Sequence, residues 1–383
     1  MPEGCGRQRG VEIAGESSVR VAVAGTGAFG RNHLRVYREL ESAGLGVSLA
    51  AAIEPDGSRA SDAAGRFGIQ VFGSVAELLA ADLRLDAVSV AVPTVHHHDV
   101  AAELLGGGLD VLIEKPLAAN LEQADDLIRI AATGHGEKGP PIVQVGHLER
   151  FNPAVLAVQP RLKRPMFFEA HRLSVFTPRS LDVDVVLDLM IHDLDIVLTF
   201  ANSPVREVRA VGLPILSPKV DIANVRVEFE SGCVANFTAS RVSTERVRKL
   251  RFFEPRQYVS IDYARRELLV IRLDSGTPGT LPPEIAALLA SGKADPAMLA
   301  QLAGGNHPSP GLSFVKPEVA PGEPLRLEIE SFLDSVRSRR APRVTLRQGR
   351  EALALALEIQ STMVAHAHRA GLGNFFEGTA QGD

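Results

Sequence analysis

Short apolar segments alternate with segments of helical periodicity in the N-terminal third of the chain. Strands are predicted at residues 19–24, 47–53, 87–92, 111–113 and 142–145, and helices between them at 75–81, 100–105 and 121–132. Asn120 is expected to cap the last of these helices, because its side chain can accept a hydrogen bond from a free backbone N–H group. Apolar strands that are separated by helices indicate a parallel sheet with both faces covered.

Beyond residue 150 the pattern changes to one of successive strands. A helix is predicted at 185–200, and strand-like segments follow at 205–211, 223–229, 234–239, 249–253, 258–262 and 268–273. Short turns such as Glu230-Ser231-Gly232 join them, which indicates a mostly antiparallel sheet. Two amphipathic helices are predicted at 325–339 and 347–368. The stretch 274–324 is rich in Pro and Gly and is interpreted as a surface insertion or lid, with a short helical patch near 285–289.

Composition and charge narrow the possible functions. Hydrophobic residues make up 45% of the 383 residues and charged residues 23%, which is typical of a globular protein. A formal net charge of −5 argues against a nucleic-acid partner, since such proteins usually carry a basic surface. No apolar run approaches the ~18 residues of a membrane helix, so membrane insertion is not expected. Cys5 and Cys233 are too few for a disulfide framework, which favours a reducing compartment and a cytoplasmic location.

A glycine-rich loop directly follows the first predicted strand, with the sequence Gly25-Thr26-Gly27-Ala28-Phe29-Gly30. Its glycines allow a tight turn, a close approach to a pyrophosphate and close packing of the next helix on the strand. The free N–H groups at the start of that helix favour an anion. Because the loop stands between a predicted strand and a predicted helix, dinucleotide binding is favoured over a glycine-rich turn without a ligand.

An acidic residue follows the second predicted strand. Glu54 lies about 20 residues beyond the loop, near the spacing expected for a carboxylate that accepts hydrogen bonds from the adenine ribose. Such a carboxylate repels a 2′-phosphate, so NAD is favoured over NADP. Arg59 could still contact a 2′-phosphate, so NADP stays an alternative cofactor.

Glu114-Lys115-Pro116 ends another strand of the predicted parallel sheet. Open parallel sheets bind ligands beyond the carboxyl ends of their strands, so Lys115 would point at a reacting centre. A lysine that is partly desolvated beside a cationic nicotinamide can have a pKa low enough for proton transfer. Spacing alone would equally fit a surface lysine before a turn proline.

Asp188 and His192 stand one turn apart in the predicted helix at 185–200 and would share a face. A carboxylate beside an imidazole orients the ring and raises its basicity, which suits acid–base catalysis. A plain helix-surface contact and a metal site are the alternatives. No second histidine or cysteine cluster stands at ligand spacing, so no metal is expected. His96, His97 and His98 are interpreted as helix-capping or ligand-contacting residues.

Together these motifs resemble the glucose–fructose oxidoreductase / inositol dehydrogenase / MocA (Gfo/Idh/MocA) family of nicotinamide-dependent sugar dehydrogenases. The resemblance rests on the glycine loop, Pro93-Thr94-Val95-His96-His97, Glu114-Lys115-Pro116, the segment 146–153 with Arg150-Phe151-Asn152-Pro153, and the segment 188–192. The departures are Thr94 for the usual Asn, the insertion at 274–324, and Met190 for the usual Gly, which is expected to narrow the space near the site.

The resemblance implies an α/β fold with two domains. Residues 1–18 would be a flexible leader, 19–145 a dinucleotide-binding Rossmann domain, and 146–383 a substrate and oligomerisation domain of α+β type with a large, mostly antiparallel open sheet. That sheet implies a homodimer or homotetramer. Lys115, Asp188 and His192 would line the reacting carbon. Further contacts to the dinucleotide would come from Val92, Pro93, Thr94, His97 and Glu114.

The segments 145–155, 182–198 and 220–243 resemble more narrowly the branch of the family that oxidises C3 of UDP-N-acetylglucosamine to a ketone. The resemblance implies that a pyridoxal-phosphate aminotransferase then uses this ketone for lipid A precursors. We expect Lys115 and His192 to share removal of the C3 hydroxyl proton, with Asp188 orienting His192. Asn152 is the expected sugar contact. The candidate cations for the diphosphate are Arg150, Arg172, Arg179, Lys219 and Arg241.

Two other functions remain open from the sequence. One is a dehydrogenase of the same family that acts on another sugar, another nucleotide sugar or inositol. The other is a regulator that binds NAD without catalysis, against which the retained Lys115, Asp188 and His192 argue.

Overall fold

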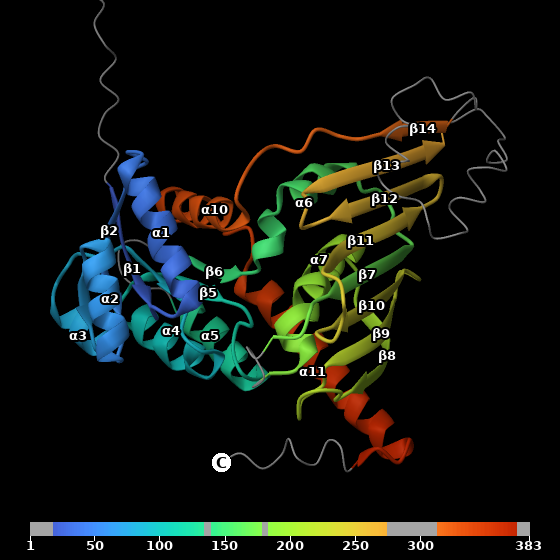
Figure 1. The fold of residues 1–383 in the computed structure, drawn as a ribbon. Coiled ribbons are helices and arrows are strands. Elements are labelled where there is room, and N and C mark those ends of the chain that lie inside the picture. Colours follow the sequence, from blue (N-terminus) through green and yellow to red (C-terminus); the bar gives the residue numbers. More distant parts are fainter. Residues whose placement is uncertain (1–17, 134–138, 178–182, 274–311, 374–383) are drawn as a thin grey trace, which may run out of the picture.

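The computed structural model describes residues 18–133, 139–177, 183–273 and 312–373. Within these ranges the chain forms two sheets that lie side by side (Figure 1). The polar leader, Arg179, the helical patch at 285–289 and most of the insertion predicted at 274–324 lie outside the described residues.

The first sheet has six parallel strands in the order β3-β2-β1-β4-β5-β6. Its strands are β1 (Val19–Ala24), β2 (Val47–Ile53), β3 (Gln70–Phe72), β4 (Ala87–Val90), β5 (Asp110–Glu114) and β6 (Val143–Gly146). The helices between them are α1 (Ala28–Ser42), α2 (Gly57–Phe67), α3 (Val75–Ala80), α4 (His97–Gly106) and α5 (Leu121–Ala132). Strands β1 to β3 extend the sheet to one side and β4 to β6 extend it to the other, so the strand order reverses between β1 and β4, and ligands of such sheets bind at this switch point. The predicted Rossmann fold is confirmed.

Local capping explains where several helices begin. The Asn120 side chain accepts a hydrogen bond of 2.9 Å from the backbone N–H of Gln123, so the predicted cap of α5 is confirmed. Asp56 and Ser74 cap α2 and α3 in the same way. Helix α4 starts at His97, three residues before the predicted start at residue 100, because a 3-10 turn at Thr94–His96 leads directly into it.

The second sheet has eight strands in the order β14-β13-β12-β11-β7-β10-β9-β8. Every pair is antiparallel except β7 and β10, so the mostly antiparallel sheet is confirmed. The strands are β7 (Phe167–Leu173), β8 (Val205–Leu213), β9 (Ile222–Phe229), β10 (Val234–Ser240), β11 (Val247–Glu254), β12 (Gln257–Asp262), β13 (Glu267–Leu273) and β14 (Leu312–Val315). Strand β7, which lies in the middle of the sheet, is absent from the strands that the sequence predicts.

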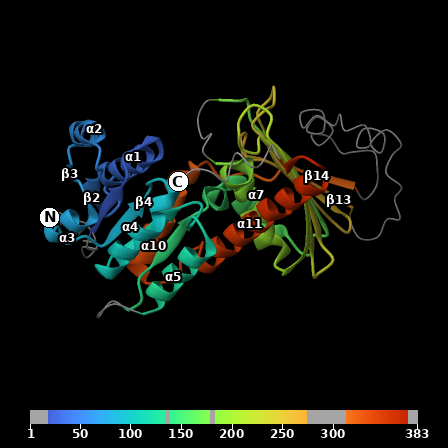
Figure 2. The same ribbon diagram turned by 90° about the horizontal axis from the view of Figure 1, so that it is seen from below.

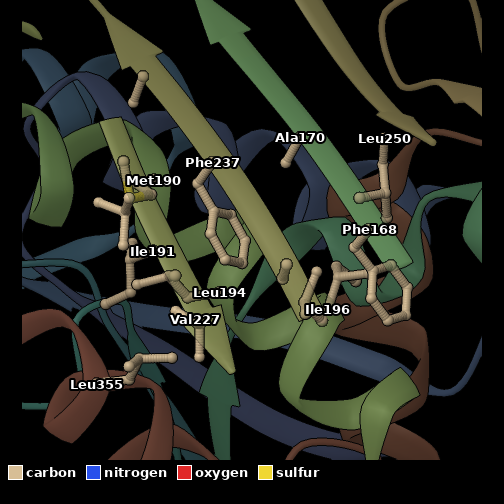
Figure 3. Packing of buried hydrophobic residues seen from close by; sticks show 14 of the residues in the cluster. Phe168, Ala170, Met190, Ile191, Leu194, Ile196, Val227, Phe237, Leu250 and Leu355 are labelled. Atoms are coloured by element: carbon tan, nitrogen blue, oxygen red, sulfur yellow. The ribbon is translucent and has the colours of Figure 1, made fainter. Parts of the chain in front are cut away.

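Helices cover one face of this sheet. They are the short α6 (Pro153–Val158), then α7 (Ile191–Ala201) and the long α11 (Leu346–Arg369). Figure 3 shows the resulting core, in which Phe168, Phe237 and Leu250 of the strands meet Leu194 and Ile196 of α7. The side chain of Met190 lies in this core and is 1% exposed. The expectation that Met190 narrows the space near the site is therefore wrong.

The helix predicted at 185–200 begins with a π-helical turn, Val186–Met190, and continues as α7. The Asp184 carboxylate starts this turn by accepting hydrogen bonds from the backbone N–H groups of Val186 and Leu187, at 2.9 and 3.1 Å. In a π turn the hydrogen bonds run from i to i+5, so residues four apart no longer share a face as they do in an α-helix. π turns are rare and often mark functional sites.

The C-terminal helices return to the first sheet. α10 (Pro324–Ser338) buries Leu325, Ile329 and Phe332 in the same core as Val21 of β1 and Leu34 of α1. The sequence alone assigns this segment to the second domain, whereas its packing joins it to the first sheet. α11 crosses from the first sheet to the second, as seen from below in Figure 2.

Candidate active site

The glycine loop has the geometry that the sequence predicts. Gly25 has φ +88°, and a Cβ there would lie 2.7 Å from the carbonyl oxygen of Ala91. A Cβ at Gly30 would lie 1.9 Å from the carbonyl oxygen of Gly25, so only glycine allows α1 to pack this closely on the loop. Gly27 is the N-cap of α1 without a capping side chain, and a Cβ there would meet nothing within 4 Å. The free N–H groups of this turn fit a pyrophosphate.

Glu54, directly after β2, is buried beside this loop. One carboxylate oxygen accepts hydrogen bonds from the backbone N–H and the hydroxyl of Thr26, at 3.0 and 2.9 Å. The other accepts from the backbone N–H of Asp56 and from the guanidinium of Arg59, at 3.1 and 2.9 Å. Burial alone would raise the pKa of Glu54, but these hydrogen bonds outweigh it and the pKa is lowered. Glu54 is therefore an ionised carboxylate at the edge where the adenine ribose of NAD would lie.

Lys115 connects the two sheets. Its Nζ donates a hydrogen bond of 2.9 Å to the backbone carbonyl oxygen of Asp188, in the π turn. Burial lowers the pKa of the Lys115 ammonium, and the positive charge of Arg172 adds to this effect, whereas the carboxylates of Asp188 and Glu114 oppose it. The net direction is downward, which favours a larger fraction of neutral amine at neutral pH.

His192 lies in the first turn of α7. Burial, together with the nearby charges of Lys115 and Arg172, lowers the pKa of His192 well below its ordinary value. The imidazole is therefore neutral at pH 7. Its Nδ1 is buried and has no hydrogen-bond partner among the described residues. Among the described residues no hydrogen bond joins Asp188 to His192, and the backbone oxygen of Asp188 accepts from Lys115, so the orienting role of Asp188 stays a prediction.

His97 lies behind Lys115 and is 1% exposed. Its Nδ1 lies 2.8 Å from the carbonyl oxygen of Pro116, and its Nε2 lies 3.0 Å from that of Val92. The ring thus joins the loop after β4 to the loop after β5, and it supports Lys115 from within. Val92, Pro93 and Thr94 stand at the carboxyl end of β4, at the same edge of the sheet as the glycine loop.

Glu114 is also buried, and its carboxylate faces the protein interior. Its Oε1 accepts a hydrogen bond of 2.9 Å from Nε2 of His33 in α1. Its Oε2 lies 3.3 Å from the backbone N–H of Lys115, which donates to it. Contacts with the dinucleotide remain a prediction for Glu114, whose observed contacts join it to His33 of α1 and to the backbone of Lys115.

Two of the predicted substrate residues are buried and hydrogen-bonded to other protein groups. Arg172 forms two hydrogen bonds with Asp193, of 2.7 and 3.1 Å, and one of 3.1 Å with Glu149. The Asn152 amide donates to the Glu149 carboxylate at 3.0 Å and to the carbonyl oxygen of Tyr263 at 3.2 Å, while its oxygen caps α6. Neither a diphosphate contact by Arg172 nor a sugar contact by Asn152 fits these arrangements.

The other proposed cations differ in their surroundings. Arg150 is 4% exposed and bonds to Asp195, Thr199 and the backbone of Arg343, so a diphosphate contact does not fit it either. Arg241 is buried and donates to the carbonyl oxygen of Val183 at 2.6 Å. Lys219 is half-buried.

Two buried histidines near the site were not found by sequence reasoning. His33 lies one turn beyond the glycine loop, and its ring contacts Phe29 edge-on with the centroids 5.4 Å apart. His147 follows β6, and neither of its ring nitrogens has a hydrogen-bond partner among the described residues. His33 could have been noticed in the sequence, because it is a polar residue on the apolar face of the helix expected after the glycine loop.

In the ranges that the structure describes, no three His, Cys, Asp or Glu side chains gather as a metal site would require. No helix in those ranges is long and apolar enough to span a bilayer.

The chain matches two models of known protein families. Residues 19–138 match the oxidoreductase family with an NAD-binding Rossmann fold, and residues 155–256 match the Gfo/Idh/MocA C-terminal domain. The protein belongs to the Gfo/Idh/MocA oxidoreductase family. It is an NAD-binding sugar dehydrogenase of that family.

Among individual relatives, the UDP-N-acetylglucosamine 3-dehydrogenase of Acidithiobacillus ferrooxidans is 33% identical over 92% of this chain and 99% of its own length. A solved structure of that enzyme matches with a TM-score of 0.76 over 91% of this chain and 99% of its own. The scyllo-inositol 2-dehydrogenase of Bacillus subtilis is 27% identical over 60% of this chain and 69% of its own length. A myo-inositol 2-dehydrogenase from Lactobacillus plantarum, at 16% identity and a TM-score of 0.70, shares the fold.

Proposed function

We propose that the protein oxidises the 3-hydroxyl of UDP-N-acetylglucosamine to a ketone. The observation that carries the proposal is the hydrogen bond between Lys115 Nζ and the backbone oxygen of Asp188, since it joins the motif after β5 to the motif before α7. The similarity to the Acidithiobacillus enzyme, which extends over 99% of that protein, supports the choice of substrate.

Each part of the site has a separate role in the proposed oxidation. The glycine loop and Glu54 hold the dinucleotide, and NAD, when bound, supplies the acceptor for the hydride. Lys115 and His192 are both favoured in their neutral forms, and one of them removes the proton from the sugar hydroxyl as the hydride leaves carbon. Fixing the hydroxyl between the base and the nicotinamide supplies most of the remaining rate enhancement.

The same proposal has consequences outside the active site. We expect the ketone to be passed to a pyridoxal-phosphate aminotransferase in lipid A precursor synthesis. We expect both enzymes in the cytoplasm, where NAD and nucleotide sugars are available. We also expect the open sheet of the second domain to form a homodimer or homotetramer.

The test is incubation of the protein with NAD and UDP-N-acetylglucosamine. We expect NADH absorbance to rise and mass spectrometry to find a sugar nucleotide that has lost two hydrogens. Added aminotransferase and glutamate should convert this unstable product to the amine. The Lys115→Ala variant is the negative control. NAD binding without turnover of any sugar would contradict the proposal and favour a regulator.

A second substrate class is favoured by a specific observation. The buried cations Arg150 and Arg172, which were expected to hold a diphosphate, are engaged by Asp195, Asp193 and Glu149. A substrate without a diphosphate, such as an inositol, would not need them. A panel of inositols and free sugars under the same NADH assay separates the two classes.

A further inference from the structure

Glu114 and His33 form a buried pair directly behind Lys115. His33 is 0% exposed and Glu114 is 7% exposed. The carboxylate accepts a hydrogen bond from His33 Nε2 at 2.9 Å, so the ring hydrogen is on that nitrogen. A buried carboxylate costs free energy unless it is hydrogen-bonded, and here a histidine from a different element supplies the donor.

The protein makes room for this pair at the neighbouring strand. Gly146 of β6 pairs with Glu114 of β5, and a Cβ at Gly146 would lie 2.9 Å from the carboxylate carbon. Any larger residue would force Glu114 away from its position. The Glu114 carboxylate thus has the His33 donor on one side and the backbone of Gly146 close by on the other. These two neighbours restrict it to one orientation.

The same pair links the dinucleotide loop to the lysine. The His33 ring packs against Phe29 of the glycine loop, and its hydrogen bond reaches the residue next to Lys115. The second carboxylate oxygen receives the backbone N–H of Lys115 itself, at 3.3 Å. Helix α1, whose first turn overlaps the glycine loop at Phe29, therefore reaches the last residue of β5 through the His33 imidazole.

Resting on the proposed function, we propose that Glu114 is a positioning residue for Lys115 and that His33 holds Glu114 in place. Neither side chain needs to touch the sugar. The pair fixes the backbone and the electrostatic surroundings of the lysine, so that Nζ stays at the carbonyl oxygen of Asp188. A small misplacement of a catalytic group can cost about 100-fold in rate.

Several charged and titratable groups face the two residues, and a pH experiment has to account for them. Around Lys115 they are Asp188 of the π turn, Arg172 of β7, and the histidines His97, His147 and His192. Around Glu114 they are His33, His97, His147 and Glu328 of α10. Among them, the negative charge of Glu114 opposes the downward shift of the Lys115 pKa.

The test uses matched variants at both positions of the full-length protein. His33→Leu removes the donor, whereas His33→Gln keeps a donor near the place of Nε2. Tyr37→Phe is the control, because it removes one buried hydrogen bond, of 2.7 Å to Ser89, from the same helix without touching Glu114. We expect His33→Leu to lower kcat by about 10- to 100-fold with little change in the sugar KM. His33→Gln should regain most of this loss, and Tyr37→Phe should affect thermal stability alone.

Glu114→Gln tests the electrostatic part. Loss of a negative charge disfavours the ammonium, so the pKa of Lys115 should fall further and the rising limb of kcat/KM should move to lower pH. A readout independent of turnover is the pH dependence of acetylation of Lys115 by acetic anhydride, followed by mass spectrometry. It reports on Lys115 even if the protein oxidises no sugar, so failure of the substrate assignment is distinguishable from failure of the positioning role.

Three results would overturn the proposal. The first is a folded His33→Leu protein with the kcat of the unaltered enzyme. The second is equal loss in His33→Leu and His33→Gln, which would make the role of His33 purely structural. The third is a Glu114→Gln protein whose acetylation profile at Lys115 is unchanged.

Discussion

Lys115 Nζ donates a hydrogen bond of 2.9 Å to the backbone oxygen of Asp188, although Lys115 follows β5 of the first sheet and Asp188 lies in the π turn before α7. A lysine at the end of a parallel strand and a π turn before a helix thereby form one site. The carboxylate of Asp188 acts on the lysine electrostatically, while His192 is left with a buried Nδ1 that has no partner among the described residues. This arrangement gives the two candidate bases different surroundings.

Lys115→Ala removes one of these bases. We expect kcat for sugar oxidation to fall by about 10²- to 10⁴-fold, as is usual when a general base is lost. NAD affinity, measured by fluorescence titration, should change little, because the glycine loop and Glu54 are untouched. Lys316→Ala, at an exposed lysine near Glu267, serves as the control. Turnover near that of the unaltered enzyme would show that Lys115 is not the base.

The pH dependence of oxidation should report the lowered pKa of Lys115. If Lys115 is the base, activity requires its neutral amine, so kcat/KM should rise with pH through a midpoint below the usual ~10.4 of lysine. Asp188→Asn removes a negative charge that raises this pKa, and the midpoint should therefore move to lower pH. Asp126→Asn, at a carboxylate bonded to His98, should leave it unchanged. A shift to higher pH in Asp188→Asn would contradict this assignment.

Glu54→Ser should alter the choice of cofactor. Loss of the carboxylate removes the acceptor for the ribose, and we expect the KM for NAD to rise about tenfold, equivalent to about 1.4 kcal/mol. Arg59 would lose its hydrogen bond with Glu54 and keep only the ion pair with Asp56, so its guanidinium could turn to a 2′-phosphate and the kcat/KM ratio of NADP to NAD should increase. The double variant with Arg59→Ala should lose that gain, and persistence of the gain would show that Arg59 is not responsible.

Arg172→Met tests the buried ion network. It leaves the carboxylates of Asp193 and Glu149 without their partner, and removing one member of a buried pair typically costs about 3–5 kcal/mol. We expect that loss in the free energy of unfolding, measured by urea denaturation. Arg251→Met, at a half-exposed pair with Glu169, should cost less than about 1 kcal/mol. A small effect at Arg172 would mean that the network relaxes or takes up water.

Much of the fold follows from local patterns. Five of the six strands of the first sheet and the cap of α5 were predicted, because apolar periodicity and capping act over a few residues, whereas the three-residue β3 was not. Strand β7 was missed for a physical reason. Its inward positions are Phe168, Ala170 and Arg172, and the buried arginine interrupts the apolar alternation that marks a strand. Only the distant carboxylates that pair with it make that position tolerable.

The site was predictable in its residue types and less so in its contacts. Lys115 and the glycine loop lie at the predicted edge, since strand order places them there. The relation of Asp188 to His192 depended on helix type, and a π turn cannot be read from residue spacing. The roles of Arg150, Arg172 and Asn152 depended on partners from other elements, such as Asp195, Asp193 and Tyr263.

Helix α11 buries Leu346 and Leu353 with the first sheet, and Leu355, Ile359 and Met363 with the second. At Gly349 it lies so close to β6 that a Cβ would come within 2.8 Å of Val145. This single helix is therefore packed into the hydrophobic cores of both sheets. A hinge motion between the two sheets would have to break or bend α11. We therefore expect substrate entry to depend on movements of side chains and short loops.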